Sequence, residues 1–400
     1  MPDTIPDVIL KPGRDKSARN RHPWVFSGAI ARVVGDPGPG DVVRVRDPRG
    51  GFVAYGYHNL RSQIRVRLLS WDEERYPDDT FWRQRLAASI ERRVGLWAGD
   101  EVTACRLVYA ESDGLPGLIL DRYGDWLVLQ ALTAGVDGRK HALAEAALAA
   151  TGARGVYERS DVDVRRHEGL PETVGLTLGE EPPERIRIAE QGVHWLADVR
   201  QGHKTGLYLD QRTNRRRLRP YAQGGRVLNV FAYTGGFGVV AAAAGAREVV
   251  HVDSSADVLA MAAANVALNG LNAQAHRYIV GDAFQVLREM RDAREEFDLV
   301  VLDPPKFAHS QHDVPAATRG YKDINMLAMA LTRPGGVLAT FSCSGRVSED
   351  LFQKVLFGAS VDAGREVRIL ERLHQDADHP VLLTFPEGAY LKGVVVRVDF

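Results

Sequence analysis

The sequence predicts an α/β protein built from three parts, and three patterns in its 400 residues lead to that fold class. Short alternating runs over residues 7–70 predict a small β-barrel. Strands followed by a helix and another strand, between residues 107 and 158, predict a small α+β domain. From residue 193 onward strands and helices alternate, which predicts a doubly wound parallel sheet. We therefore expect domains over residues 1–75, 76–190 and 191–400.

The composition is that of an ordinary globular protein, with 45% apolar and 26% charged residues. No apolar run approaches the roughly 18 residues that a membrane span needs, and the first residues lack the basic-then-apolar pattern of a signal peptide. Two cysteines, Cys105 and Cys343, leave no disulfide framework and no cysteine-based zinc site. We expect a cytoplasmic protein with no membrane partner and no metal.

The N-terminal segment is basic. Residues 1–70 hold twelve Lys or Arg and six acidic residues, a net charge of +6, which leaves −7 for the other 330 residues because the whole chain carries −1. This asymmetry suggests a polyanion-facing module attached to an acidic body, and a solvated arginine-rich surface explains the charge alone equally well. Aromatic residues beside basic ones at 19–26 are typical of RNA surfaces, although Trp24 and Phe26 equally suit a core, which is the position we expect for Phe26. The candidate RNA contacts in this segment are Lys11, Arg19, Arg21 and Trp24.

The central segment begins with a helix expected from about Asp78 to Leu96. Strands at 107–109, 118–121 and 126–130 follow, then a helix at 138–150 and a strand at 155–158. Cys105 is expected to be a buried, inert thiol. The acidic, Gly- and Pro-bearing stretch 176–192 predicts a turn-like boundary before the third domain.

The C-terminal segment carries five strands that each lead toward a helix or turn. We expect them at 226–231, 248–253, 278–280, 299–303 and 336–344, with strands 366–372 and 392–399 closing the sheet. Helices are expected up to Gly245 and at 256–269, 283–292 and 348–362. In open α/β sheets, ligands bind outside the carboxyl ends of the strands.

Three of these strand ends predict a nucleoside-bearing cofactor. Gly235, Gly236 and Gly238 follow the first strand and permit a tight turn close to a ligand. Asp253 ends the second strand, where a carboxylate accepts hydrogen bonds from ribose hydroxyls. Asp282 ends the third, where it and the Ala283 amide can hold an adenine amine. Each acid alone could be a helix N-cap, and the glycine spacing does not match the dinucleotide motif.

The stretch from Phe297 to Phe307 organises the rest of the chain. Its apolar strand ends in Asp303, and two prolines then stop the hydrogen-bonded ladder. Cys343 ends the fifth strand on the same edge, where a thiolate can attack C6 of a pyrimidine and activate C5 toward methylation. Asp303 would hydrogen-bond N3 and the exocyclic amine of cytosine. Lys306 would lower the thiol pKa or contact phosphate. Alone, a strand-end cysteine is more often a buried small hydrophobe.

Several long motifs, in order along the chain, carry a family resemblance. They are Trp24–Gly28, Glu158–Asp161, Lys204–Arg212, Asn229–Phe237, Asp303–Phe307, Arg319–Asn325, Thr340–Gly345, Asp378–Pro380 and Pro386–Gly388. Together they resemble the ribosomal RNA large subunit methyltransferase I family of S-adenosylmethionine-dependent 23S rRNA cytosine-C5 methyltransferases. Ala232 and Gly238 stand where relatives often place serine.

The resemblance implies an N-terminal PUA domain, a C-terminal Rossmann-like class I methyltransferase domain, and 23S rRNA or a large-subunit precursor as the partner. It also implies that Tyr208–Arg212 closes over the cofactor and that Cys343 is the nucleophile. A homodimer is left open. The expected S-adenosylmethionine contacts are Tyr208, Asp210, Gln211, Arg212, Asn229, Phe231, Tyr233, Thr234, Gly235, Gly236, Asp253, Ser254, Asp282, Ala283, Asp303 and Pro304. Lys306, Tyr321 and Lys322 join the expected RNA contacts.

Three alternatives remain at this point. An exocyclic-amine methyltransferase, acting for example on guanine N2, often has an aromatic residue directly after its two prolines, and Lys306 occupies that position here. If the chain were a non-catalytic RNA-binding protein, we would expect its site to lack one of the acids, the glycines or the cysteine, and all of these are present. A nicotinamide-dependent oxidoreductase is disfavoured by the glycine spacing.

Overall fold

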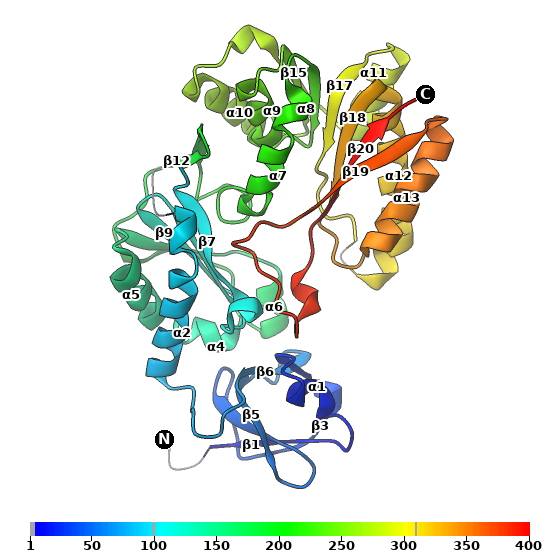
Figure 1. Cartoon of the computed structure of the whole chain (residues 1–400). Helices are drawn as coiled ribbons and strands as arrows, with labels where there is room; N and C mark the ends of the chain where they lie inside the picture. Colours follow the sequence, from blue (N-terminus) through cyan, green and yellow to red (C-terminus); the bar gives the residue numbers. More distant parts are fainter. Residues whose placement is uncertain (1–4, 98–100, 309) are drawn as a thin grey trace. The chain divides into compact units, whose positions relative to one another are not determined.

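The computed structural model describes residues 5–97, 101–308 and 310–400 (Figure 1). The chain divides into two compact units. The first unit comprises Met1–Ala189, Ala197–Leu209 and Ala377–Gly388, and the second comprises Glu190–Leu196, Asp210–Asp376 and Ala389–Phe400. Two segments that we expected in the third domain, 197–209 and 377–388, therefore belong with the first two.

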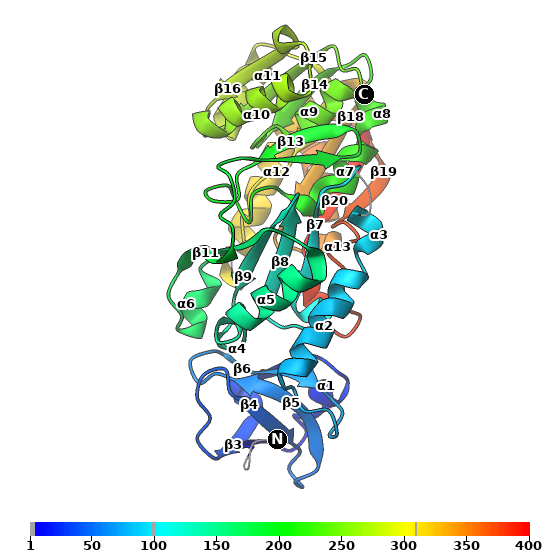
Figure 2. The same ribbon diagram turned by 90° about the vertical axis from the view of Figure 1, so that its left-hand side faces the viewer.

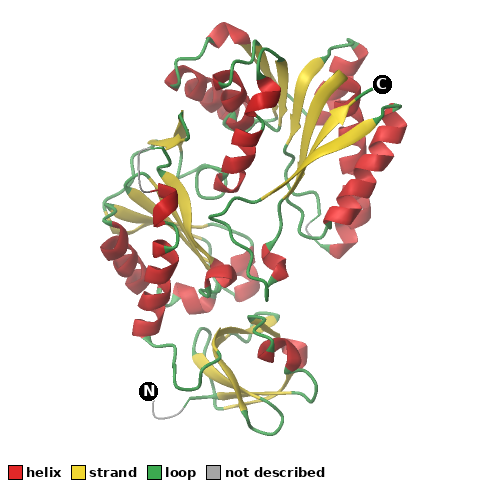
Figure 3. Cartoon of the chain, viewed as in Figure 1, coloured by secondary structure: helices red, strands yellow, loops and turns green. Residues whose placement is uncertain are grey.

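The N-terminal part of the first unit is mostly strand (Figure 3). Six strands form one sheet in the order β2-β6-β5-β4-β1-β3, in which β1 and β4 are parallel. Apolar residues at alternate positions, among them Val43, Val45, Val66 and Leu68, form its core. The strands are β1 (Asp7–Leu10), β2 (Trp24–Phe26), β3 (Ile30–Val34), β4 (Val42–Arg46), β5 (Phe52–His58) and β6 (Ile64–Ser70), with the short helix α1 (Lys16–Arg19).

The central part of the first unit is a five-stranded sheet with helices α2 and α5 packed beside each other (Figure 2). Asp78 caps α2 by accepting a hydrogen bond from the Phe81 amide at 2.8 Å. Cys105 has no exposed surface, as expected. The strand order is β11-β10-β9-β8-β7. The elements are α2 (Asp79–Glu91), β7 (Ala104–Tyr109), β8 (Leu118–Tyr123), β9 (Trp126–Ala131), α5 (Lys140–Thr151), β10 (Gly155–Ser160) and β11 (Thr173–Gly179), with the short helices α3 (Val94–Trp97), α4 (Ala134–Asp137) and α6 (Val164–Glu168).

The stretch 176–192 is not the turn that we expected. It contains the end of β11 and all of β12 (Ile186–Glu190), which pairs with β13 (Val193–Ala197). The buried, alternating side chains of Ile186 and Ile188 make this segment a strand despite its acidic, proline-bearing start. The division between the two units does fall inside it, after Ala189.

The second unit contains the predicted doubly wound sheet, in the order β16-β15-β14-β17-β18-β20-β19. Its first five strands are parallel, and β20 runs antiparallel to both of its neighbours. The order reverses between β14 and β17, which is the point where such sheets bind ligands. The strands are β14 (Arg226–Val230), β15 (Glu248–Asp253), β16 (His276–Val280), β17 (Phe297–Leu302), β18 (Thr332–Ser342), β19 (Val367–His374) and β20 (Lys392–Val398).

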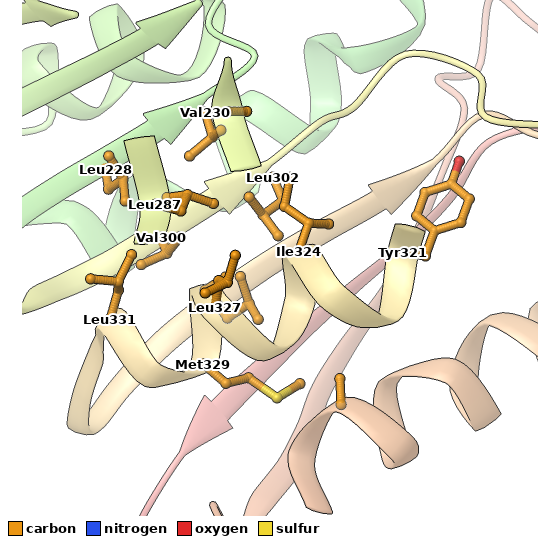
Figure 4. Close-up of a cluster of buried hydrophobic side chains, with 14 of the residues drawn as sticks. Leu228, Val230, Leu287, Val300, Leu302, Tyr321, Ile324, Leu327, Met329 and Leu331 are labelled. Atoms are coloured by element: carbon orange, nitrogen blue, oxygen red, sulfur yellow. The ribbon is translucent and has the colours of Figure 1, made fainter. Parts of the chain in front are cut away.

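Successive residues of the buried strands supply two cores on opposite faces of this sheet. Leu228 and Val300 belong to the core under α11 (Ala283–Asp292), α12 (Val314–Leu331) and α13 (Glu349–Ala363), part of which Figure 4 shows. Val227 and Leu299 belong to the core on the other face, with α8 (Arg219–Ala222) and α9 (Gly236–Ala243). Helices α7 (Arg212–Arg217) and α10 (Ala256–Leu268) complete the unit. None of the helices within the described ranges has the length and apolar character needed to cross a membrane.

Candidate active site

Asp303 and Cys343 lie on one edge of the seven-stranded sheet, as the sequence predicted. Strands β17 and β18 are parallel neighbours with Leu302 opposite Thr340, so the residues after both strands emerge on the same side. The Sγ atom of Cys343 lies 3.9 Å from the carbonyl oxygen of Pro304. The thiol is therefore directly against the turn that follows Asp303.

The two serines around Cys343 are both tied to Tyr321. Ser342 Oγ donates to the Tyr321 hydroxyl at 3.0 Å, and that hydroxyl lies 3.1 Å from Ser344 Oγ. The Ala308 amide also donates to Ser344 Oγ at 3.3 Å. Because both flanking residues are held, the backbone that carries the thiol has little freedom.

Tyr321 itself is not the RNA contact that we expected. Its side chain has no exposed surface and is part of the core under α12, where Figure 4 shows its ring on the helix. Burial raises the pKa of its hydroxyl, which keeps the group protonated as a hydrogen-bonding partner for the serines. Its neighbour Lys322 forms an ion pair with Asp362 at 2.7 Å and is half-buried.

Asp303 is held by a chain of amide side chains. Gln211 Nε2 donates to Asp303 Oδ2 at 3.1 Å, and Asn214 Nδ2 donates to Gln211 Oε1 at 2.6 Å. The second bond fixes which way the Gln211 amide faces, so that its NH₂ group points at the carboxylate. Gln211 thus contacts an expected catalytic residue, in addition to the cofactor role that the sequence suggested.

Other residues of the expected cofactor segment make buried polar contacts. Arg212 forms an ion pair with Asp376 at 2.8 Å, and the Tyr390 hydroxyl donates to Asp210. Tyr208 belongs to the first unit, where the Lys204 ammonium lies 4.4 Å from the centre of its ring. The segment from Tyr208 to Arg212 therefore spans both units.

The loop after β14 has the backbone geometry of a binding site. Phe231 and Tyr233 adopt positive φ angles of 57° and 48°, and Gly235 has φ of 88°. Strained non-glycine residues of this kind occur where a loop is shaped for a ligand. The Asp253 carboxylate accepts a hydrogen bond from the Tyr233 amide at 2.9 Å, and it also accepts one from the Ser255 amide at 3.1 Å.

Two buried polar atoms support a ligand at this loop. Within the described part of the chain, Asn229 Nδ2 and Thr234 Oγ1 are buried without a hydrogen-bond partner. Buried groups of this kind are rare unless a ligand or water satisfies them. Asp282 is exposed and caps α11 by accepting from the Gln285 amide at 3.0 Å, and Ala283 is buried. The loop, these atoms and the strand-end carboxylates fit a nucleoside-bearing cofactor.

The exposed residues at this edge include Ser254, Pro305 and Lys306. The buried cation at this edge is Lys392, which the sequence did not single out. Its side chain is 7% exposed, and its Nζ donates to the carbonyl oxygens of Ser344 and Tyr390. The available signal was a lysine as the first residue of a mostly apolar strand, which is an unusual place for a charge. The described residues contain no cluster suited to a metal ion.

The basic side chains of the N-terminal sheet fall into two groups. Arg44 and Arg46 both form ion pairs with Asp7, and Arg67 is buried between two glutamates. Arg19 is exposed but paired with two aspartates. The charges of Arg44, Arg46 and Arg67 are therefore compensated by carboxylates, which indicates a structural role for these three strand residues.

The second group surrounds a hollow of about 570 Å³. It is lined by residues that include Arg14, Lys16, Asn20, Trp24, Phe26 and Gly28. Phe26 is 50% exposed, which differs from our expectation of a core residue. The Trp24 indole N–H donates to Glu111 at 2.8 Å, while its ring borders the hollow. Lys11 donates to the Gly28 carbonyl beside it, and Arg21 is exposed.

Comparison with known proteins adds the family. Residues 129–395 match the model of S-adenosylmethionine-dependent methyltransferases, and residues 8–71 match the model of PUA-like domains. A ribosomal RNA large subunit methyltransferase I from Erwinia tasmaniensis is 49% identical over 98% of this chain and 99% of its own. One of the same name from Aeromonas hydrophila is 49% identical over 98% of both chains.

The fold also has solved counterparts. A Streptococcus mutans structure, provisionally assigned as a SAM-dependent methyltransferase, superposes with a TM-score of 0.85. It covers 99% of this chain and all of its own, at 21% identity, which supports the fold alone. With the methyltransferase model covering most of its length and curated relatives at 49% identity, the chain belongs to the S-adenosylmethionine-dependent methyltransferases, in the family named ribosomal RNA large subunit methyltransferase I.

Proposed function

We propose that this protein methylates C5 of a cytosine in 23S rRNA, with Cys343 as the nucleophile. The observation that carries the proposal is the position of the Cys343 thiol, 3.9 Å from the Pro304 carbonyl, on the edge where Asp303 also emerges. Two of the relatives described above are named as methyltransferases of large-subunit ribosomal RNA. A thiol beside a carboxylate suits attack on a pyrimidine ring, whereas amine methylation needs no nucleophile from the protein.

S-adenosylmethionine, when bound, supplies an electrophilic methyl group on a sulfonium. The loop with Phe231 and Tyr233 would hold it, with Asp253 accepting from the ribose and the orphaned Asn229 amide and Thr234 hydroxyl as further polar partners. Gly235 allows the close backbone approach that this needs.

The chain's own residues carry the rest of the reaction. The target base must leave its stack to reach Cys343. The Cys343 thiolate adds to C6, which forms an Sγ–C6 bond and makes C5 nucleophilic. Asp303, oriented by Gln211, accepts a hydrogen bond from the exocyclic amine and, when it carries a proton, donates to N3, where the negative charge of the attacked ring develops. Once C5 carries the methyl group, a base accepts the C5 proton, the electron pair of that C–H bond forms the C5–C6 double bond, and the Sγ–C6 bond breaks with its electron pair returning to Cys343.

The N-terminal sheet supplies the RNA contact in this proposal. The hollow beside Trp24 and Phe26 combines exposed aromatic surface with cationic side chains such as Arg14 and Lys16. Stacking of unpaired bases on aromatic rings, with cations at the phosphates, is how many proteins bind single-stranded RNA. The expected contact at Lys306 remains compatible with its exposure at the turn.

The test is methyl transfer from tritiated S-adenosylmethionine to unmodified 23S rRNA, followed by nucleoside digestion. We compare the wild type with Cys343→Ala, and with Cys105→Ala as the matched control because Cys105 is the other cysteine and is fully buried elsewhere. Label in 5-methylcytidine from the wild type and Cys105→Ala, but not from Cys343→Ala, is the expected result.

Two outcomes contradict the proposal. Label in a methylated guanosine or adenosine would assign the enzyme to amine methylation. Near wild-type labelling of cytidine by Cys343→Ala would exclude the covalent mechanism. If naked rRNA takes no label, the same assay with large-subunit particles from unmethylated cells decides whether rRNA is the substrate at all.

A further inference from the structure

Lys392 places a buried ammonium beside the residues that carry Cys343. It is the first residue of β20, where it pairs with Ser342 of β18 on one side and with His374 of β19 on the other. Its Nζ donates to the Ser344 carbonyl at 2.9 Å and to the Tyr390 carbonyl at 2.8 Å. Only 7% of the residue is exposed. The charge is therefore held in place and largely removed from water.

This ammonium lacks a carboxylate partner in the described part of the chain, where no Asp or Glu oxygen lies within the 4.0 Å of an ion pair. Two ionisable groups act on the ammonium by their charge, Cys343 and Glu349 at the start of α13. The Tyr321 hydroxyl is linked to it indirectly, because it contacts Ser344 and the carbonyl of Ser344 accepts from Nζ. Glu349 is itself engaged by His374 at 2.8 Å. Two backbone carbonyls therefore hold the ammonium, and Cys343 is the first of the ionisable groups whose charge acts on it.

Burying a cation without a paired carboxylate lowers the stability of the fold. A lysine at this position therefore suggests a role other than stability. Burial lowers the pKa of Lys392 to about 8, while negative charge on Cys343, and next on Glu349, acts to raise it. The Coulomb interaction between ammonium and thiolate is mutual. The thiolate stabilises the charged form of the lysine, and the ammonium stabilises the charged form of the cysteine to the same extent. Lys306 cannot supply this effect as strongly, because it is exposed and screened by water.

We propose that Lys392 is a positioning residue for Cys343: it fixes the Ser344 carbonyl next to the thiol and supplies the positive charge that keeps the sulfur ionised. The inference rests on the proposed function for its chemical meaning. The ammonium stabilises the thiolate before it adds to C6 and again when the Sγ–C6 bond breaks. The proton stays on Lys392 throughout, and the electron pair of the broken bond returns to sulfur.

The experiment measures how fast iodoacetamide alkylates Cys343 between pH 6 and pH 10, without RNA or cofactor. Peptide mass spectrometry separates Cys343 from the buried Cys105. We compare the wild type with Lys392→Met, with Lys392→Arg as the charge-conserving variant, and with Lys354→Met, an exposed lysine of α13 paired with Asp350, as the matched control.

In Lys392→Met we expect the midpoint of the alkylation profile to rise by about one pH unit, which is about a tenfold slower reaction at pH 7. Lys392→Arg and Lys354→Met should keep the wild-type midpoint. A residue that only supports the fold would change the amount of folded protein or its melting temperature without moving this midpoint.

An unchanged midpoint in folded Lys392→Met overturns the inference. So does a wild-type midpoint at or above the ordinary thiol value of about 8.5, a result that needs no variant to fold. Because alkylation requires neither RNA nor methyl transfer, the outcome is independent of the labelling assay. A shifted midpoint together with label in the wrong nucleoside would retain the role of Lys392 and reject the proposed substrate.

Discussion

The His251 imidazole fills the space that a side chain at Gly238 would need: a methyl group at Gly238 would come within 2.3 Å of Cε1 of His251. The imidazole cannot easily move away. It has no exposed surface, its ring stacks on Tyr278 with 5.0 Å between centroids, and its Nε2 lies 3.0 Å from Nδ1 of His276. Gly238 is thus matched to the histidine opposite it.

Gly238→Ala should therefore destabilise the protein. Overpacking of a fixed core typically costs about 1–3 kcal/mol, which exceeds the gain in helix propensity of about 1 kcal/mol. The matched control is Gly320→Ala in α12, where the new methyl group would meet Phe307 at an ordinary 3.6 Å and should be neutral or stabilising. Urea unfolding measures both. Equal stabilities of the two variants would show that His251 can give way.

The same histidine should make stability depend on pH. Burial, and next the nearby His276, lower the pKa of His251 from 6.5 to about 3. The native state keeps the ring neutral, while the unfolded chain takes up a proton below its ordinary pKa. The contribution of the neutral ring to the free energy of unfolding is thus complete above pH 6.5 and is lost as the pH falls toward 3. Between pH 7 and pH 5 this lowers the free energy of unfolding by roughly 2 kcal/mol.

The measurement is urea unfolding at pH 7 and pH 5. His251→Asn should flatten the difference between the two pH values, whatever its effect on absolute stability. His312→Asn, which changes an exposed histidine of the same unit, should leave the difference as in the wild type. A wild-type protein whose free energy of unfolding is equal at both pH values would contradict the buried, neutral state of His251.

The strands of the second unit could be predicted because each is an apolar run that ends in a polar residue or turn. Helix α12 was not predicted, although Ile324, Leu327 and Leu331 have helical spacing and pack into the core in Figure 4. Pro315 and Gly320 in the same stretch suggest a loop. The proline lies in the first turn, which tolerates it, and the glycine packs on Phe307.

In the site, the sequence could supply the residue types at the strand ends but not their partners. Asp303 and Cys343 were predictable because parallel strands deliver their ends to one edge. The contacts of Gln211 with Asp303 and of Lys392 with Ser344 join residues 92 and 48 positions apart, and no local pattern encodes them. Tyr321 was misassigned for the same reason, because its burial comes from tertiary packing around a motif that reads as polar.

Arg67 should be a major contributor to the stability of the first unit. Its guanidinium donates to Glu111 at 2.8 Å and to Glu168 at 3.0 Å, and all three side chains are at least 92% buried. Arg67→Met would leave two carboxylates buried without their cation, which typically costs about 3–5 kcal/mol. Arg166→Met removes an exposed arginine with two acidic partners and should leave stability unchanged. Unfolding of the two variants by urea gives the comparison.

Cations without a carboxylate partner in the segment 11–29, which includes the lining of the hollow, should carry the salt dependence of RNA binding. Within the described residues, Lys11, Arg14 and Arg21 have no carboxylate at ion-pair distance. Replacing all three by Gln should weaken RNA binding and lower the slope of log K against log salt by about 0.7 for each phosphate that the protein no longer neutralises. Arg46→Gln, whose charge is already paired with Asp7, is the control and should keep the slope. A slope that survives the triple substitution would place the RNA-binding surface elsewhere.

Gln211 offers the sharpest test of how Asp303 is held. Gln211→Glu keeps the size of the side chain but replaces the N–H donor to Asp303 Oδ2 with a second carboxylate, so the two like charges repel. We expect kcat to fall by about ten- to a hundredfold with little change in the dissociation constant for S-adenosylmethionine, because Asp303 would act on the base. Calorimetry and single-turnover labelling measure the two quantities, with the exposed Gln274→Glu as control. If Gln211→Glu instead loses cofactor affinity and keeps kcat, Gln211 is the cofactor ligand that the sequence suggested, and Asp303 does not depend on it.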